Sequence, residues 1–436
     1  MNHLGKAPVI FAILLGLSFL LIIFRESDKK STLEFWVFAQ THYEEYQASI
    51  PSFEASNPGV TIKLRQVTNI HDKLLAAFLS GIGAPDLAEV EISSVGRFFK
   101  NSKKEIPFID LTERVESSNL TNVFLPARVA PWVFRNRLYG LPHDVHPVVL
   151  LYREDVYREA GIQFNLIETW EDFLKTGRRF VEFDKSQGHT PRYPLMLSAN
   201  HPGHFWLMLL QNGGGMFDKE GNIIIDNSIA VSTLEFYCQL FHNDDLAIPA
   251  FAGPIDSPPN FAAMKDGVVL GLLAPDWYIG SIRSYVPELA GKWRAMPLPA
   301  WHKNGRRTST WGGTMIGITK QSKHIDIAWS FARHIYTNEK AFANRYIKTN
   351  IIPPIQSTWR NPVFQKNDKY FGGQQLGLLL TQLGAEIPSF YLNPYWAEGS
   401  ELLRHAVYES VHKIKTPKQA LAKVAGDLRS LRTRTP

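Results

Sequence analysis

Strand-like and helix-like patterns alternate between residues 33 and 91, and this alternation constrains the fold more than any other feature of the chain. Residues 33–38, 60–64 and 85–91 have the apolar composition or the alternation of strands. The two segments between them carry apolar residues at helical spacing. The order strand, helix, strand, helix, strand predicts a sheet of parallel strands covered by helices.

The length of the chain, 436 residues, exceeds what a single hydrophobic core usually serves, so we expect two domains. A hydrophobic content of 44% and a charged content of 20% are typical of a globular protein. The formal net charge of +6 does not come from a basic stripe interleaved with aromatic residues, so we expect no nucleic-acid partner. Cys238 is the single cysteine, which excludes an intrachain disulfide.

The N-terminal segment, residues 7–24, is uncharged and almost wholly apolar, with Lys6 before it and Arg25 after it. Such a segment at a chain terminus indicates an export signal or a membrane anchor. No small-residue cleavage site follows Phe24, and no cysteine is present there for lipid attachment. We therefore expect residues 1–30 to stay attached as an anchor, with the globular part outside the cytoplasmic membrane.

A turn, a buried strand and a short helix succeed one another between residues 139 and 161. The Tyr-Gly-Leu-Pro turn at 139–142 precedes an apolar run at 148–152 and a helical segment at 154–160. Three polar residues stand between the turn and the strand: His143, Asp144 and His146. Polar groups at the end of an apolar strand are well placed for ligand contact in an open α/β sheet, and a solvated surface turn is the alternative.

The sequence Y-G-L-P-x-D, followed by Y-x-x-D, A-G-I and T-W-E-D-F, resembles a family of transport proteins. The family is that of the extracellular solute-binding proteins of ABC transporters, family 1, in the sugar-binding branch that includes maltose-binding protein. Further motifs at 53–62, 83–87 and 213–226 follow the order of that family. The resemblance extends from residue 33 to about residue 430.

The resemblance implies a two-lobed α/β fold, in which each lobe is a mostly parallel sheet flanked by helices and three crossing strands join the lobes. Lobe 1 would comprise residues 31–145, with 298–348 returning to it. Lobe 2 would comprise residues 146–297, with 349–436 completing it. The implied function is the capture of a solute, expected to be a carbohydrate, and its delivery to permease subunits by hinge closure. We expect a monomer.

Several local expectations accompany this fold. Thr169 has capping-box spacing ahead of a helix, and residues 223–225 follow a turn as a short strand. The second and third crossing strands would be residues 292–299 and 350–354. Ser322 is placed to cap the helix that follows it.

The resemblance places ligand-binding residues at strand ends and loops along a cleft. Sugar rings pack on indole while their hydroxyls bind carboxylates and amides. The aromatic candidates, for each of which core packing is the alternative, are Trp36, Trp206, Trp277, Trp311, Tyr395 and Trp396. The other candidates are Gln40, His42, Glu91, Ser93, Asp144, His146, His201, Gly312 and Gly313. We expect Trp277 to stack on the ligand and Asp144 to accept a hydrogen bond from it, directly or by orienting a neighbour.

Patterns for catalysis are missing from the sequence. It has no H-E-x-x-H, G-x-S-x-G, P-loop or G-x-G-x-x-G motif, so we expect no enzyme, no cofactor and no metal site. Glu89 and Glu91 share one face of a strand, whereas a glycosidase needs its carboxylates on opposite sides of the bond. Three alternatives remain open: a carbohydrate-active enzyme, a tethered ligand sensor, and a binding protein for an anionic solute.

The anchor can be tested on protein taken from native membranes. We expect intact-mass and N-terminal analysis to find residues 1–30 still attached, because no cleavage site follows the apolar segment. A mature N-terminus between residues 25 and 35 would contradict this expectation.

Overall fold

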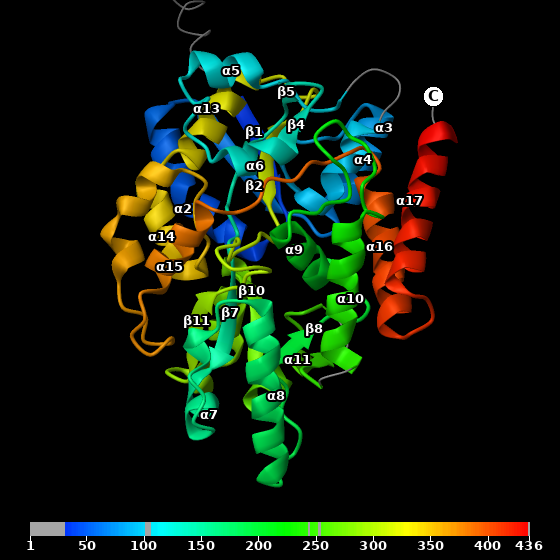
Figure 1. Ribbon diagram of the computed structural model, residues 1–436. Coiled ribbons are helices and arrows are strands. Elements are labelled where there is room, and N and C mark those ends of the chain that lie inside the picture. Colours follow the sequence, from blue (N-terminus) through cyan, green and yellow to red (C-terminus); the bar gives the residue numbers. More distant parts are fainter. Residues whose placement is uncertain (1–30, 101–105, 243–244, 252–253, 435–436) are drawn as a thin grey trace, which may run out of the picture.

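The computed structural model describes residues 31–100, 106–242, 245–251 and 254–434 (Figure 1). The expected membrane anchor, residues 1–30, lies outside the described residues. Among the described helices, none is both long enough and apolar enough to cross a membrane.

The first sheet has the strand order β2-β1-β3-β12-β6. Its strands are β1 (Ser31–Val37), β2 (Val60–Gln66), β3 (Leu87–Glu91), β6 (Leu141–Pro142) and β12 (Thr314–Ile318). The first three pair in parallel, as the strand–helix alternation predicts, with α2 (Gln40–Ser56) and α3 (Ile70–Ser80) as the connections. β12 joins the sheet antiparallel to both β3 and β6.

The second sheet has the order β11-β7-β10-β8-β9. Its strands are β7 (Val148–Arg153), β8 (Leu195–Leu197), β9 (Ala247–Pro249), β10 (Gly271–Pro275) and β11 (Trp293–Pro297). β10, β8 and β9 are parallel, and β7 and β11 are antiparallel to their neighbours. Each sheet is thus a parallel core of three strands extended by antiparallel strands. All six residues of β7 are buried: the apolar run at 148–152, as its composition predicts, and Arg153 at its end.

Helices flank both sheets, and a two-stranded hairpin of β4 (Val133–Phe134) and β5 (Arg137–Leu138) lies beside the first (Figure 1). The remaining α-helices are α4 (Val95–Phe99), α5 (Thr112–Ser117), α6 (Pro126–Val129), α7 (Glu154–Glu159), α8 (Trp170–Ser186), α9 (Gly203–Gln211), α10 (Ser228–His242), α11 (Pro258–Lys265), α12 (Asp276–Tyr285), α13 (Ile325–Tyr336), α14 (Glu339–Thr349), α15 (Leu376–Gly384), α16 (Trp396–Val411) and α17 (Pro417–Arg434).

The local expectations have mixed outcomes. The capping box at Thr169 is confirmed at the start of α8. The strand at 223–225 is wrong: Ile224 N donates to Met216 O (3.0 Å), so this segment pairs with the loop before it instead of with a sheet. The cap at Ser322 is also wrong, because α13 starts at Ile325 with His324 as its N-cap. The Ser322 hydroxyl donates to Asp86 (2.6 Å) and accepts from His324 N (3.1 Å), which precedes the first helical residue.

Three segments connect the two sheets and lie side by side. Residues 143–147 link β6 to β7, residues 298–313 link β11 to β12, and residues 350–354 follow α14. Val145 N donates to Ile352 O (3.0 Å), and Val148 N donates to Ser309 O (3.1 Å). The third segment is irregular, not the strand we expected.

The C-terminal helices pack on both halves of the molecule. α16 contacts α4 beside the first sheet and α10 beside the second. We propose that the lobes meet at the three connecting segments, with residues 31–145 and 298–348 in one lobe and residues 146–297 and 349–436 in the other.

Candidate functional site

Two cavities lie against the connecting segments. The larger, of about 620 Å³, opens between the start of α2 and the exposed face of α12. The smaller, of about 100 Å³, is bounded by α9 and α16. Glu91, Trp311 and Gly312 line both, so the two cavities share a wall. The size of the larger cavity falls in the range of pockets for small-molecule ligands.

Twelve of the fifteen predicted site residues line these cavities. Around the larger cavity lie Gln40, His42, Glu91, His146, Trp277, Trp311, Gly312 and Gly313. Around the smaller lie Glu91, Ser93, His201, Trp206, Trp311, Gly312 and Trp396. The sequence therefore predicts residues that are scattered along the chain but converge in space.

Three predicted residues line neither cavity. Trp36 donates its indole N–H to Glu34 on the same strand (2.8 Å), and Tyr395 lies beneath the ammonium of Lys100. Asp144 is fully buried, with no exposed side-chain surface. Its burial corrects the expectation of a direct hydrogen bond to a ligand and leaves the indirect role, through a neighbour.

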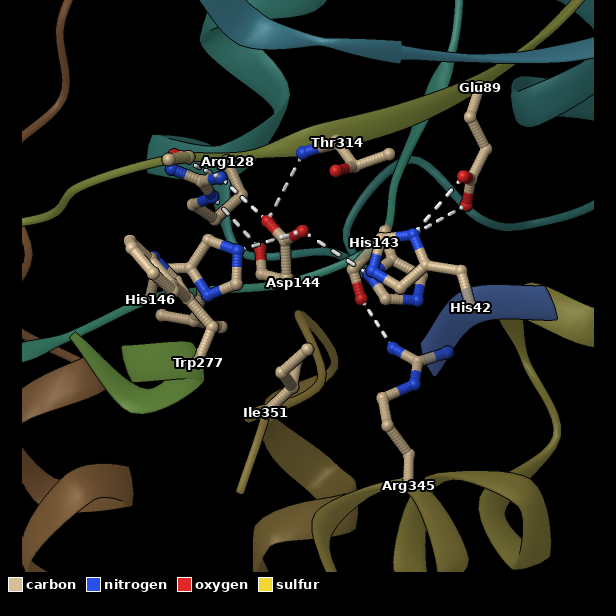
Figure 2. A network of polar contacts seen from close by, with 12 residues as sticks. His42, Glu89, Arg128, His143, Asp144, His146, Trp277, Thr314, Arg345 and Ile351 are labelled. Carbon is tan, nitrogen blue, oxygen red and sulfur yellow. Dashed lines mark hydrogen bonds and ion pairs between the residues drawn. The ribbon is translucent and has the colours of Figure 1, made fainter. Parts of the chain in front are cut away.

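Asp144 is held by charged and polar groups on every side (Figure 2). Arg128 Nη2 donates to Asp144 Oδ1 (2.7 Å), and Arg128 Nε donates to the backbone oxygen of Asp144 (2.8 Å). His146 Nε2 lies 3.0 Å from the other carboxylate oxygen. Burial alone would raise the pKa of Asp144, but His146, the hydrogen bond to His143 and the charge of Arg128 hold it well below its usual range. The carboxylate is therefore ionised.

His146 lies between two buried carboxylates. Its Nδ1 is 2.5 Å from Asp276 Oδ1, at the start of α12, and its Nε2 contacts Asp144. Burial opposes the charged form, but the two carboxylates raise the pKa of His146 to about 9. The ring is thus an imidazolium that donates from both nitrogens, which leaves no N–H for a ligand. His146 orients the cavity wall.

The bridge from Asp144 through His146 to Asp276, here called the His146 bridge, is tied by hydrogen bonds to all three connecting segments. Asp276 Oδ2 accepts from Ile352 N (2.8 Å), and Asp276 Oδ1 accepts from Trp277 N (2.7 Å). Arg128 also donates to the backbone oxygen of Gly312 (3.1 Å). The network therefore fixes the backbone on which Trp277 and Gly312 are mounted.

Glu89 and Glu91 lie on the same strand but have different surroundings, because Glu89 belongs to a second buried network. Glu89 is fully buried, accepts from the Tyr46 hydroxyl (2.7 Å) and lies 2.9 Å from His42 Nδ1. Burial opposes the charge on His42, but Glu89 raises its pKa. Glu91 instead reaches both cavities, and burial raises its pKa although Ser93 hydrogen-bonds to it. Glu89 is a structural residue, and the two carboxylates do not face each other across a cavity.

Trp311 forms the partition between the two cavities. Trp277 Nε1 donates to Trp311 O (3.0 Å), and the two rings meet edge to face with centroids 6.0 Å apart. The rings of His204 and Trp311 also meet edge to face, with centroids 4.8 Å apart. A Cβ on Gly203 would lie 2.3 Å from that ring, so the indole rests directly on the helix backbone.

The remaining residues of the site differ in how readily sequence patterns reveal them. Asp276 follows an apolar strand and precedes Trp277, so the strand-end rule that selected Trp277 could have found it. Arg128 and Arg345 stand in unremarkable helical segments, and only the structure brings them to the network (Figure 2). Within the described residues, no group of three or more His, Cys, Asp or Glu is arranged to hold a metal ion.

Comparisons with known proteins agree with this geometry. Residues 39–341 match the model of a family described as bacterial extracellular solute-binding protein. The arabinooligosaccharide-binding protein of Bacillus subtilis (strain 168) is 31% identical, over 97% of this chain and 99% of that protein. The arabinooligosaccharide-binding protein of Halalkalibacterium halodurans is 30% identical, over 92% and 90%.

Solved structures share the fold. The sugar-binding protein MalE from Xanthomonas citri superposes with a TM-score of 0.76 at 19% identity, over 93% of this chain and 98% of that one. This likeness supports a two-lobed arrangement of the two sheets.

The His146 bridge predicts a pH dependence of stability. The pKa of His146 is about 9 when folded and about 6.5 when unfolded, so its stabilisation is complete below pH 6.5 and is lost as the pH rises through 9. We expect His146→Gln to lower the free energy of unfolding by about 3 kcal/mol at pH 6 and by much less at pH 9.5. Urea unfolding at both pH values measures this difference.

His302→Gln removes an exposed histidine from a loop and serves as the control, with no expected change at either pH. An equal loss at both pH values for His146→Gln would contradict the charged bridge.

Proposed function

Because the chain belongs to the family of bacterial extracellular solute-binding proteins, we propose that it captures an oligosaccharide outside the cytoplasmic membrane and delivers it to the permease of an ABC transporter. The observation that carries this proposal is the cavity at the three connecting segments, whose walls combine indole rings with carboxylate, amide and hydroxyl groups. Indole faces suit the C–H faces of sugars, and the polar groups suit their hydroxyls.

Arabinooligosaccharides are the ligands that we propose for this cavity. Both curated relatives named above are arabinooligosaccharide-binding proteins, and each aligns over nine tenths or more of this chain. The cavity also has room for more than one sugar unit, given its volume of about 620 Å³.

The charges around the cavity favour an uncharged ligand over an anionic one. The cation at His146 is matched by Asp144 and Asp276, and His42 is matched by Glu89. An anion would therefore meet a wall whose buried positive charges are already neutralised. Of the other titratable side chains on that wall, Lys348 is basic, whereas Glu91 and Asp256 are acidic. The excess of basic residues in the whole chain does not extend to this site.

A carbohydrate-active enzyme is less well supported. Glu89 and Glu91, the two acidic residues on one strand, do not form a catalytic pair, because Glu89 is enclosed by His42 and Tyr46. A tethered sensor would use the same site, so uptake of labelled oligosaccharide by cells with and without the gene separates the two. Loss of uptake supports transport, and retained uptake supports a sensor.

Closure of the lobes would couple capture to delivery. The larger cavity is lined by the start of α2 from one side and by α12 from the other, so one ligand can contact both. A ligand that contacts both lobes stabilises the closed form through its higher affinity for that form. We propose that the permease recognises the closed form, that the protein is a monomer, and that residues 1–30 keep it at the membrane.

Isothermal calorimetry with arabinooligosaccharides tests the ligand and the site together. We expect the wild type to bind, and Trp277→Ala to lose about 2 kcal/mol or more of binding free energy, or about 30-fold in Kd, because a stacked aromatic side chain in a buried site is a binding hot spot.

Trp36→Ala is the matched control, because Trp36 is a half-buried tryptophan that lines neither cavity. It should leave the affinity unchanged. Equal affinities for the wild type and folded Trp277→Ala would reject the assignment of Trp277.

Small-angle X-ray scattering tests closure. We expect a smaller radius of gyration when arabinooligosaccharide saturates the protein, because the lobes rotate towards each other about the connecting segments. An unchanged radius at saturation would argue against the hinge mechanism.

A further inference from the structure

One face of α12 runs along the larger cavity from its interior to its mouth. Trp277, Ser281, Ser284 and Tyr285 all line this cavity, and their spacing of four, three and one residues places them on one side of the helix. The inner end of the helix is fixed, because Asp276 is bonded to His146 and to Ile352 N. The face is therefore a rigid wall with an aromatic ring at each end.

Tyr285 is a surface aromatic residue with a fixed orientation. Its side chain is 61% exposed although it lines the cavity. Its ring stacks on the buried ring of Phe261, with centroids 4.9 Å apart and an interplanar angle of 19°. One face of the tyrosine is thus occupied, and the position of the ring is set before any ligand arrives. A pre-oriented ring loses little conformational entropy on binding.

The two rings are too far apart to hold the same sugar unit. Eight residues separate Trp277 from Tyr285, which corresponds to about 12 Å along the helix axis. A ligand that reaches both must therefore be a chain of several sugar units. This length requirement links Tyr285 to oligosaccharides and not to monosaccharides.

Polar groups occupy the stretch between the two rings and the wall opposite. Ser284 Oγ donates its proton to Gly280 O (3.0 Å), so its oxygen keeps lone pairs that can accept from a sugar hydroxyl. Across the cavity lie Gln40 and Thr41, at the start of α2. Thr349, at the end of α14, lines the cavity beside α12, because its backbone packs against Gly280. An aromatic wall facing a polar wall matches the two kinds of surface on a sugar chain.

We infer that Tyr285 forms an outer binding subsite, on which an oligosaccharide packs a sugar unit that lies beyond the unit on Trp277. This inference rests on the proposed function and adds the preference for ligand length. Tyr285 contributes only when the chain is long enough to reach the mouth of the cavity. Affinity then rises with the number of sugar units until the outer subsite is filled.

Calorimetric titration of the full chain with arabinooligosaccharides of two to five units tests the inference. We expect Tyr285→Ala to weaken binding of the longest ligand by about tenfold and to leave binding of the disaccharide unchanged. Tyr285→Phe keeps the stacking ring and should bind every length as the wild type does. Trp277→Ala should weaken binding of all lengths.

The outcomes separate this inference from the proposed function. Binding that depends on Trp277 but is the same for Tyr285→Ala and the wild type at every length would overturn the outer subsite alone. A loss for Tyr285→Ala that is equal at all lengths would also overturn it. If the wild type binds no arabinooligosaccharide, the proposed ligand falls together with this inference.

Discussion

The bridge from Asp144 through His146 to Asp276 is the interaction on which the rest of the site depends. A charged group in a buried position is costly when it stands alone. Here the imidazolium lies between two carboxylates, and Arg128 forms an ion pair with the other oxygen of Asp144. The charges compensate one another only while all the connecting segments are in place. The junction between the lobes is therefore specified by electrostatics as well as by packing.

Much of the fold follows from local patterns, whereas the junction does not. The apolar run of β7 and the capping box of α8 are short-range signals, and the structure confirms both. The pairing of β12 with β3 joins residues more than two hundred positions apart, so no window of sequence contains it. Ser322 shows the same limit, because a hydroxyl suited to a helix cap is bound by the distant Asp86.

The candidate site divides in a similar way. Tryptophans at strand ends are visible in the sequence, and Trp277 and Trp311 do line the cavity. Trp36 has the same sequence signature but points along its own strand to Glu34. Asp144 has the chemistry of a ligand contact, yet its burial makes it a support for His146. Residue type predicts what a side chain can bind, and only the three-dimensional arrangement shows which partner occupies it.

The close approach of Gly203 to Trp311 has a consequence for how such proteins diverge. The indole that separates the two cavities rests on a position where even one methyl group would collide with it. A substitution at Gly203 would displace the indole and so change the volumes of both cavities. Gly203 lines the smaller cavity, and Trp311 separates it from the larger one. Ligand preference in the larger cavity can therefore change through a residue on the far side of the indole, while the chemical groups that face the sugar stay the same. Sequence comparisons restricted to the side chains that line the larger cavity would overlook such a change.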